Sequence, residues 1–289
     1  MPTDYQTPRT TETTEESAPG FARPPKFGLI IVGDEILSGK RADKHLPKTI
    51  ELLGERGLHL DYAEYVGDAP ERITATLARA FASGDVVFST GGIGATPDDH
   101  TRQCAAKALQ RPLELHPEAK ALITERMRDT AAEQGVAFEP ERADNVHRLN
   151  MGVFPQGARI IPNPYNKIPG FSVGHVHFVP GFPVMAWPMM AWVLDQYYPA
   201  LFVRDAWIEK SIVVFGGMEA TLTPLMESIE QNHPLAKVFS LPSVDHPQHG
   251  RHIELGVKGP PEVVAAAYPA LLEGLSRFDV KLGPELVRT

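Results

Sequence analysis

Short apolar segments alternate with amphipathic ones from Lys26 onward, and no other feature of the chain restricts its fold as strongly. Residues 28–32 and 58–66 have the pattern of buried strands, whereas residues 43–56 and 70–83 have the pattern of helices. Strands that alternate with helices along a chain form a parallel sheet with helices packed on its faces. The sequence therefore predicts an α/β fold for this part of the chain.

A second unit begins near Asp205, where the order of elements changes. A strand and a helix are followed by two successive strands and another helix, an order that suits a small α+β subdomain with its helices on one face of a sheet. We expect these elements at residues 207–214, 219–232, 237–241, 252–257 and 260–277. This change of pattern divides the chain into a first domain at residues 26–204 and a subdomain at residues 205–289.

Residues 1–25 are rich in Thr, Glu and Pro and contain few large apolar side chains. Such a segment cannot bury enough surface to offset the entropy that is lost when a chain becomes ordered. We expect a flexible tail here, with ordering against a partner subunit as the alternative.

The overall composition excludes several classes of protein. The chain has 289 residues, of which 43% are hydrophobic, and a formal net charge of −8 without any Lys/Arg-rich stretch, so we expect a globular protein with no nucleic-acid partner. The single cysteine, Cys104, permits no disulfide within the chain and fits a reducing compartment. No apolar run is long enough to span a bilayer and the N-terminus has no export signal, so we expect a cytoplasmic protein with no membrane partner.

Residues 90–101 are rich in glycine and follow an apolar strand at residues 85–89. Ligands of open α/β sheets bind at the carboxyl ends of the strands. Glycines let the backbone approach a ligand closely, and the start of the next helix presents unpaired N–H groups to an anion. Phosphate or pyrophosphate is the ligand expected here, and a glycine-rich turn whose aspartate caps the helix is the alternative. The expected contacting residues are Thr90, Gly91, Gly92, Gly94 and Thr101.

Asp98 and Asp99 follow these glycines directly. Two carboxylates beside a phosphate repel it unless a cation lies between them. A Mg²⁺-type ion that bridges carboxylate and phosphate oxygens removes this conflict. We therefore expect a metal-assisted site with Asp98 and Asp99 as metal ligands, or a site in which an acidic group hydrogen-bonds an uncharged part of the ligand.

Two further polar turns follow strands of the same predicted sheet. The first turn comes after residues 28–32 and contains the candidate ligand contacts Gly33, Asp34, Glu35 and Ser38. The second contains Asp68, for which capping of the next helix is the alternative role. Because the carboxyl ends of parallel strands lie at one edge of a sheet, we expect all three loops on the same side.

These motifs have a counterpart in a known family. They are the sequence GDE at residues 33–35 with SG at 38–39, VGD at 66–68, and TGGIG at 90–94 followed by DD at 98–99. Together they resemble the molybdopterin-binding domain of molybdenum cofactor biosynthesis proteins of the MoaB and Mog type. The variant with DDHT at 98–101, NP at 163–164, PGF at 169–171 and VPGFP at 179–183 is similar to the competence/damage-inducible protein A (CinA) family.

The resemblance covers about residues 26–199, and the segment beyond resembles that family's small following subdomain. Ala95 stands where a proline is common, and Phe182 stands where a small turn residue is usual. Since the chain as given ends at residue 289, we expect it to lack the nicotinamide-mononucleotide amidase domain of longer members. These departures leave the fold expectation unchanged and weaken the prediction of activity.

The resemblance implies a three-layer α/β/α sandwich that forms homo-oligomers. In the cofactor-biosynthesis relatives, aspartates that match Asp68 and Asp99 serve molybdenum insertion into the bound molybdopterin, and the stretch that matches residues 91–94 holds its terminal phosphate. In the competence/damage-inducible branch, the domain is associated with metal-dependent hydrolysis of the pyrophosphate of ADP-ribose. Both activities imply Asp68 and Asp99 as catalytic residues, glycines for phosphate and a divalent metal such as Mg²⁺ or Co²⁺.

Asn163 and Lys167 lie in a connection rich in proline and glycine. In the family that the chain resembles, this connection closes over the pocket, so we expect both residues to contact the ligand and Lys167 to bring positive charge to an acidic site. A solvated turn is the alternative for this segment.

Three functions follow as hypotheses. The first is a protein that binds a phosphorylated pterin or nucleotide at the glycine-rich loop. The second is an active Mg²⁺- or Co²⁺-dependent ADP-ribose pyrophosphatase, and the third is a binding module without catalytic activity. The sequence does not decide between an enzyme and a binding protein.

Overall fold

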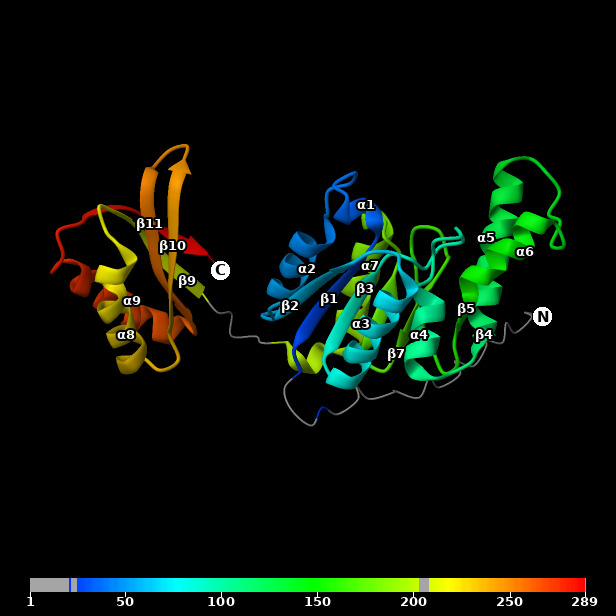
Figure 1. Cartoon of the computed structure of the whole chain (residues 1–289), viewed down its shortest axis with the longest axis horizontal. Coiled ribbons are helices and arrows are strands. Elements are labelled where there is room, and N and C mark those ends of the chain that lie inside the picture. Colours follow the sequence, from blue (N-terminus) through cyan, green and yellow to red (C-terminus); the bar gives the residue numbers. More distant parts are fainter. Residues whose placement is uncertain (1–20, 22–24, 203–207, 289) are drawn as a thin grey trace, which may run out of the picture. The chain divides into compact units, whose positions relative to one another are not determined.

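The computed structural model describes Phe21, residues 25–202 and residues 208–288 (Figure 1). The chain forms two compact units, of which the first ends at Phe202. The boundary expected from the sequence lies between residues 204 and 205. Apart from Phe21 and Pro25, the tail predicted for residues 1–25 lies outside the described residues.

A six-stranded sheet forms the centre of the first unit, in the order β2-β1-β3-β8-β7-β6. The first four of these strands run parallel to one another, whereas β7 runs antiparallel to both β8 and β6. Their bounds are β1 Phe27–Val32, β2 Tyr62–Val66, β3 Val86–Thr90, β6 Arg159–Ile161, β7 Gly170–Val173 and β8 Val176–Val179. Gly174 joins β7 to β8 in a hairpin with φ +57°. We call the side where β1, β3 and β8 end the carboxyl edge.

Helices cover both faces of this sheet. On one face, Leu29 and Ile31 of β1 share a core with α2 (His45–Gly54) and α7 (Pro183–Tyr197). On the other face, Ile30 and Val32 share a core with helices α3, α4 and α5. The bounds of these helices are α3 Pro70–Ser83, α4 Thr101–Leu109 and α5 Pro117–Glu133. The three-layer α/β/α sandwich is therefore confirmed, and every residue of β1 is buried because both faces of its sheet are covered.

The strand predicted at residues 58–66 is shorter in the structure, where β2 begins at Tyr62. The preceding residues end α2 instead. Gly57 has φ +68°, and the N–H of Leu58 donates to the Leu53 carbonyl at 2.9 Å. Left-handed glycines commonly end helices in this way. The side chains of Leu58 and Leu60 pack on the core, but these two residues are not part of β2.

An arm beside the main sheet contains two short strands and one helix, α6 (Ala143–Leu149), that the sequence pattern did not predict (Figure 1). Its two short strands, β4 (Leu113–Leu115) and β5 (Val153–Pro155), pair antiparallel. Between them lie α5, α6 and a short 3-10 helix at Asn150–Gly152. Strands of three residues carry too short a pattern to be recognised from sequence. A four-residue helix, α1 (Asp34–Leu37), was also not predicted.

The second unit has a four-stranded antiparallel sheet in the order β10-β11-β9-β12. Its core contains residues from both of its helices, so α8 and α9 pack on the same face of the sheet. The elements are β9 Ile208–Phe215, α8 Glu219–Asn232, β10 Lys237–His246, β11 Gly250–Gly259, α9 Pro261–Leu275 and β12 Lys281–Arg288. The final strand β12 was not predicted, because its sequence has few apolar residues and Pro284 interrupts it.

Candidate functional site

Gly91 is the first residue after β3, and it lies against the ends of two neighbouring strands. Its N–H donates to the Val179 carbonyl at the end of β8, with an N···O distance of 3.1 Å. A Cβ atom on Gly91 would lie 2.3 Å from the carbonyl oxygen of Val32 at the end of β1. Because φ is also +93°, only glycine fits here without strain. The loop therefore begins at the carboxyl edge.

Thr101 joins this loop to the first turn of α4. Its hydroxyl donates to the Gly91 carbonyl at 3.1 Å, and its N–H donates to the Gly92 carbonyl at 3.0 Å. A Cβ atom on Gly92 would lie 2.2 Å from Thr101 Oγ1, so a side chain there would break these bonds. Thr90 is buried, and its hydroxyl has no hydrogen-bond partner within the described part of the chain. The sequence predicted Thr101 as a ligand contact, but in the structure its hydroxyl and N–H hold the loop.

Asp99 closes the turn that follows the glycines. Its Oδ2 accepts hydrogen bonds from the Thr96 N–H, at 2.8 Å, and from the Thr96 hydroxyl. A Cβ atom on Gly94 would lie 2.6 Å from the same oxygen. Asp98 is exposed, and a hydrogen bond from Thr96 holds the pKa of its carboxyl below the usual value. The two carboxylates predicted as metal ligands therefore differ, because Asp99 binds its own turn whereas Asp98 lies open to solvent.

Asp34 and Asp68 connect the two other loops of the carboxyl edge. The N–H of Asp34 donates to Asp68 Oδ2 at 3.0 Å, and the N–H of Asp68 donates to Asp34 Oδ1 at 3.2 Å. The N–H of Gly33 donates to the Val66 carbonyl at 2.9 Å, which holds the ends of β1 and β2 together. A Cβ atom on Gly67 would lie 2.3 Å from Asp34 Oδ1. The prediction that these loops meet at one edge is correct.

The carboxylates at this edge interact electrostatically. Burial raises the pKa of Asp68, and the hydrogen bond from the Asp34 backbone opposes this rise. The negative charges of Asp34, Glu35 and Asp98 raise the pKa of Asp68 further. Asp98 thus lies near enough to Asp68 to influence its charge, although the two residues come from different loops. The carboxyl edge concentrates negative charge that a cation would balance.

A divalent metal fits the chemistry of this edge only in part. Carboxylate oxygens are the ligands that Mg²⁺ prefers, and Asp98 is the exposed carboxylate that would hold it together with oxygens of a phosphate and water. Within residues 25–202 and 208–288, however, no three His, Cys, Asp or Glu side chains are arranged to hold a metal ion. Asp99, the other predicted metal ligand, has one carboxylate oxygen bound to Thr96.

The remaining predicted contacts lie in different surroundings. Ser38 is exposed, and its N–H donates to the Asp34 carbonyl at 2.9 Å. Asn163 is buried, and its side-chain amide donates to Asn166 Oδ1 at 2.8 Å and to the Ile168 carbonyl at 2.9 Å, so it stabilises its own turn. Lys167 Nζ lies 2.6 Å from Glu125 Oε1 and 2.6 Å from Asp129 Oδ2, both on α5. Its charge is therefore paired on α5.

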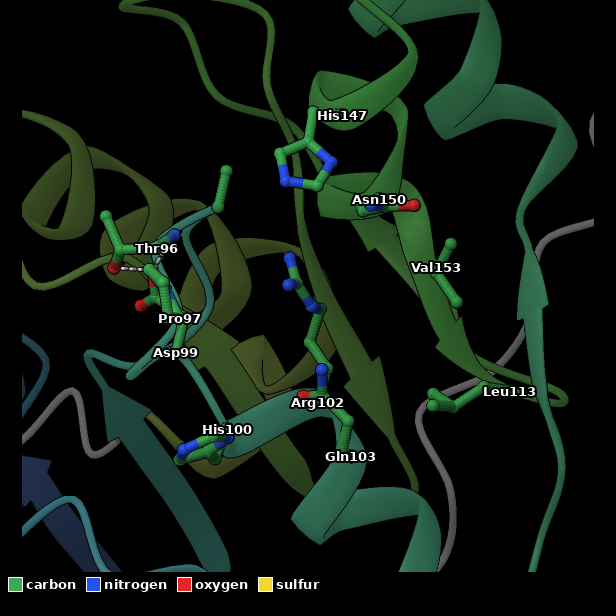
Figure 2. Close-up of a pocket in the computed structure, with 11 residues that line it drawn as sticks. Thr96, Pro97, Asp99, His100, Arg102, Gln103, Leu113, His147, Asn150 and Val153 are labelled. Carbon is green, nitrogen blue, oxygen red and sulfur yellow. Dashed lines mark hydrogen bonds between the residues drawn. The ribbon is translucent and has the colours of Figure 1, made fainter. Parts of the chain in front are cut away.

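A cavity of about 640 Å³ lies on the outer side of residues 95–100. It is partly open to solvent and is lined by that segment, the start of α4 and the arm that contains α6 and β5 (Figure 2). Figure 2 shows the Arg102 side chain extending from α4 towards His147 and Asn150. The lining residues are Ala95, Thr96, Pro97, Asp99, His100, Arg102, Gln103, Leu113, His147, Asn150 and Val153.

The sequence interpretation did not single out Arg102, His147 or Asn150. His147 and Asn150 lie about 50 residues from the glycine loop along the chain and reach the cavity only through the arm. The one local signal was a basic residue directly after Asp98-Asp99-His100-Thr101.

Comparison with known proteins identifies the first unit. The family model described as "Probable molybdopterin binding domain" matches residues 28–201, which is more than half of the chain. The chain belongs to this molybdopterin-binding domain family. The resemblance predicted from the loop motifs is confirmed, and the matched residues include the three loops of the carboxyl edge.

Curated relatives of this molybdopterin-binding domain protein support the same grouping. The chain is 33% identical over 160 residues to a CinA-like protein from Anaeromyxobacter sp. (strain K), an alignment that covers 54% of this chain and 37% of that protein. It is 30% identical over 258 residues to a protein from Pyrobaculum calidifontis, covering 86% of this chain and 93% of that one. The chain therefore spans well under half the length of the first relative.

Solved structures include the protein CinA from Thermoplasma acidophilum, which is 27% identical. That alignment covers 60% of this chain and 97% of that one, with a TM-score of 0.49.

Among the described residues of the present protein, no helix is both long and apolar enough to cross a membrane.

Proposed function

We propose that the first unit binds a phosphorylated pterin or nucleotide at the carboxyl edge, with residues 91–94 in contact with its phosphate. The observation that carries this proposal is the position of Gly91, which has no room for a side chain against Val32 and begins the loop at the ends of three strands. Anions bind well where backbone N–H groups and a helix start converge. The family's described ligand, molybdopterin, carries such a phosphate.

A second function, metal-dependent hydrolysis of a pyrophosphate such as that of ADP-ribose, is favoured by one observation. The charges of Asp34, Glu35 and Asp98 all act on Asp68, so this edge holds more negative charge than a phosphate site without a cation tolerates. A bound Mg²⁺ or Co²⁺ would polarise the phosphoryl oxygens and favour ionisation of a bound water. Asp68, whose pKa is raised, would accept a proton from the attacking water, and Asp99 would hold the loop in its binding conformation.

A binding module without turnover is the third function, and it requires the same loop geometry without proton transfer at Asp68. In each case we propose a cytoplasmic homo-oligomer that has neither nucleic acid nor membrane as a partner. The net charge of −8 agrees with the first of these exclusions.

Two measurements on the full chain test these functions. Mass spectrometry of the purified protein is expected to find a bound phosphorylated pterin or nucleotide, and the absence of binding to either class in titrations would contradict the proposal. Incubation with ADP-ribose and Mg²⁺ or Co²⁺ then separates an enzyme from a binding module. Asp68→Asn should abolish any hydrolysis, whereas Asp195→Asn, which alters the ion pair of an α7 residue with Arg56 after the end of α2, should not.

A further inference from the structure

Arg102 is a buried arginine that has no carboxylate partner in the described part of the chain. Arg102 is only 5% exposed, and its Nη1 donates a hydrogen bond to the Ile93 carbonyl at 2.7 Å. It takes part in none of the ion pairs formed by the described residues. Burial lowers the pKa of Arg102, and the charge of Asp99 opposes this effect.

A buried charge is destabilising unless an opposite charge or several hydrogen bonds compensate for the lost hydration. One carbonyl compensates Arg102 only in part. Asp99 is the acidic residue that lines the same cavity, but one of its carboxylate oxygens accepts two hydrogen bonds from Thr96. A bound anion in the cavity would supply the missing partner, and the planar guanidinium group suits the oxygens of a phosphate.

The cavity is larger than a phosphate group needs. Its volume of about 640 Å³ lies in the range of sites for small organic molecules, roughly 300–1,000 Å³. Polar side chains that can donate hydrogen bonds surround Arg102, and these are His100, Gln103, His147 and Asn150. Apolar side chains complete the wall, and these are Pro97, Leu113 and Val153. Such a wall suits a molecule with one anionic group and one flat or apolar part.

We propose that this cavity binds an organic phosphate of nucleoside-monophosphate size, with Arg102 pairing with its phosphate. The apolar wall of Leu113 and Val153 would contact the base or sugar of that molecule. Residues 91–94 do not line the cavity, so this site differs from the phosphate contact of the glycine loop. The proposal therefore holds whether or not the glycine loop binds a phosphate.

AMP is the probe, and isothermal titration calorimetry on the full chain measures its affinity. Arg102→Met removes the charge while keeping a long side chain, and it should weaken AMP binding by at least about tenfold. Its thermal midpoint should stay equal or rise, because a buried charge is replaced by an apolar group.

Arg111→Met is the matched control, since Arg111 is exposed and also donates to a backbone carbonyl, that of Gln156, at 3.2 Å. Its AMP affinity should stay within about twofold of the parent. Equal affinity in Arg102→Met and the parent, or no binding of millimolar AMP by the parent, overturns the proposal.

If Arg102→Met does not fold, Asn150→Asp decides the question. Asn150 is exposed, so the change leaves the core intact while placing a carboxylate in the cavity wall. That carboxylate should repel phosphate and weaken AMP binding by at least about tenfold, and unchanged affinity overturns the proposal. A crystal structure with AMP separates this site from the glycine loop. Phosphate density at Arg102 supports the inference, whereas phosphate density at residues 91–94 alone overturns it and supports the proposed function.

Discussion

Asp34 and Asp68 each accept a hydrogen bond from the backbone N–H of the other residue, at 3.2 and 3.0 Å. This exchange joins the loop after β1 to the loop after β2, which lie 34 residues apart along the chain. Each aspartate therefore keeps a carboxylate in place at the carboxyl edge without a basic residue. Backbone N–H groups stabilise these negative charges, because they donate hydrogen bonds to the carboxylates without neutralising them.

Gly67→Ala should break this exchange. The new Cβ would lie 2.3 Å from Asp34 Oδ1, so the Asp34 carboxylate must turn away and the Asp68 N–H loses its acceptor. We expect the free energy of unfolding to fall by about 1 kcal/mol in urea titrations. Gly54→Ala at the end of α2 is the matched control, since no atom lies within 4 Å of its Cβ position. The control should be neutral or more stable by up to about 1 kcal/mol, and equal losses in both variants would contradict the role of Gly67.

Asp99→Asn separates a catalytic carboxylate from a structural one. The Asn side-chain oxygen still accepts the Thr96 N–H, so the turn and the thermal midpoint should be preserved. On a substrate that the parent hydrolyses, the rate should fall by about 10²-fold or more if the charge of Asp99 serves a metal or a proton transfer. Thr96→Val, which removes one donor to Asp99 and leaves its charge, is the comparison variant. A rate in Asp99→Asn equal to the parent's would assign Asp99 to loop structure alone.

His177 should make the stability of the first unit depend on acidic pH. It is fully buried between Ser172 Oγ, 2.7 Å from Nδ1, and the Tyr198 hydroxyl, 2.6 Å from Nε2. Burial holds its pKa well below 6.5, so the unfolded chain binds a proton more readily than the folded one. Its contribution to stability is complete above pH 6.5 and is lost as pH falls from 6.5 towards the folded pKa, by up to about 1.4 kcal/mol per pH unit.

Denaturant titrations of the full chain between pH 5 and 7.5 measure this slope. His177→Gln should reduce it, whereas His59→Gln should leave it nearly unchanged, because 85% of the His59 side chain is exposed. A slope that is the same in the parent and in His177→Gln would show that other groups cause the pH dependence.

The protein should be a homo-oligomer. Val184 and Trp187 lie three residues apart on α7, so they share one helix face, and Val184 is 53% exposed. Ile50 on α2, which packs beside α7, is also 52% exposed. Light scattering should give a mass of at least twice the monomer mass of 31.7 kDa. Val184→Glu should shift the population towards the monomer. A parent mass of 31.7 kDa at micromolar concentration would contradict the expectation.

Local sequence patterns determined the class of the first unit and the position of its three loops. A strand buried on both faces needs a continuous apolar run, and parallel strands bring the turns after them to one edge, so both can be inferred without coordinates. The close approach of Gly91 to Val32 follows the same logic, since a glycine directly after such a strand marks a position where backbones meet.

Tertiary structure alone decided the surroundings of the charged side chains of Lys167 and Arg102. Lys167 pairs with Glu125 and Asp129, which lie 42 and 38 residues earlier in the chain, and no local pattern carries that information. Arginine is usually exposed, so the sequence alone would leave Arg102 on the solvent side of α4. The arm with α6 and β5 covers that side and buries it. Periodicity in a sequence reports which face of an element is apolar, whereas the partner of a charged group depends on segments that meet only after the chain has folded.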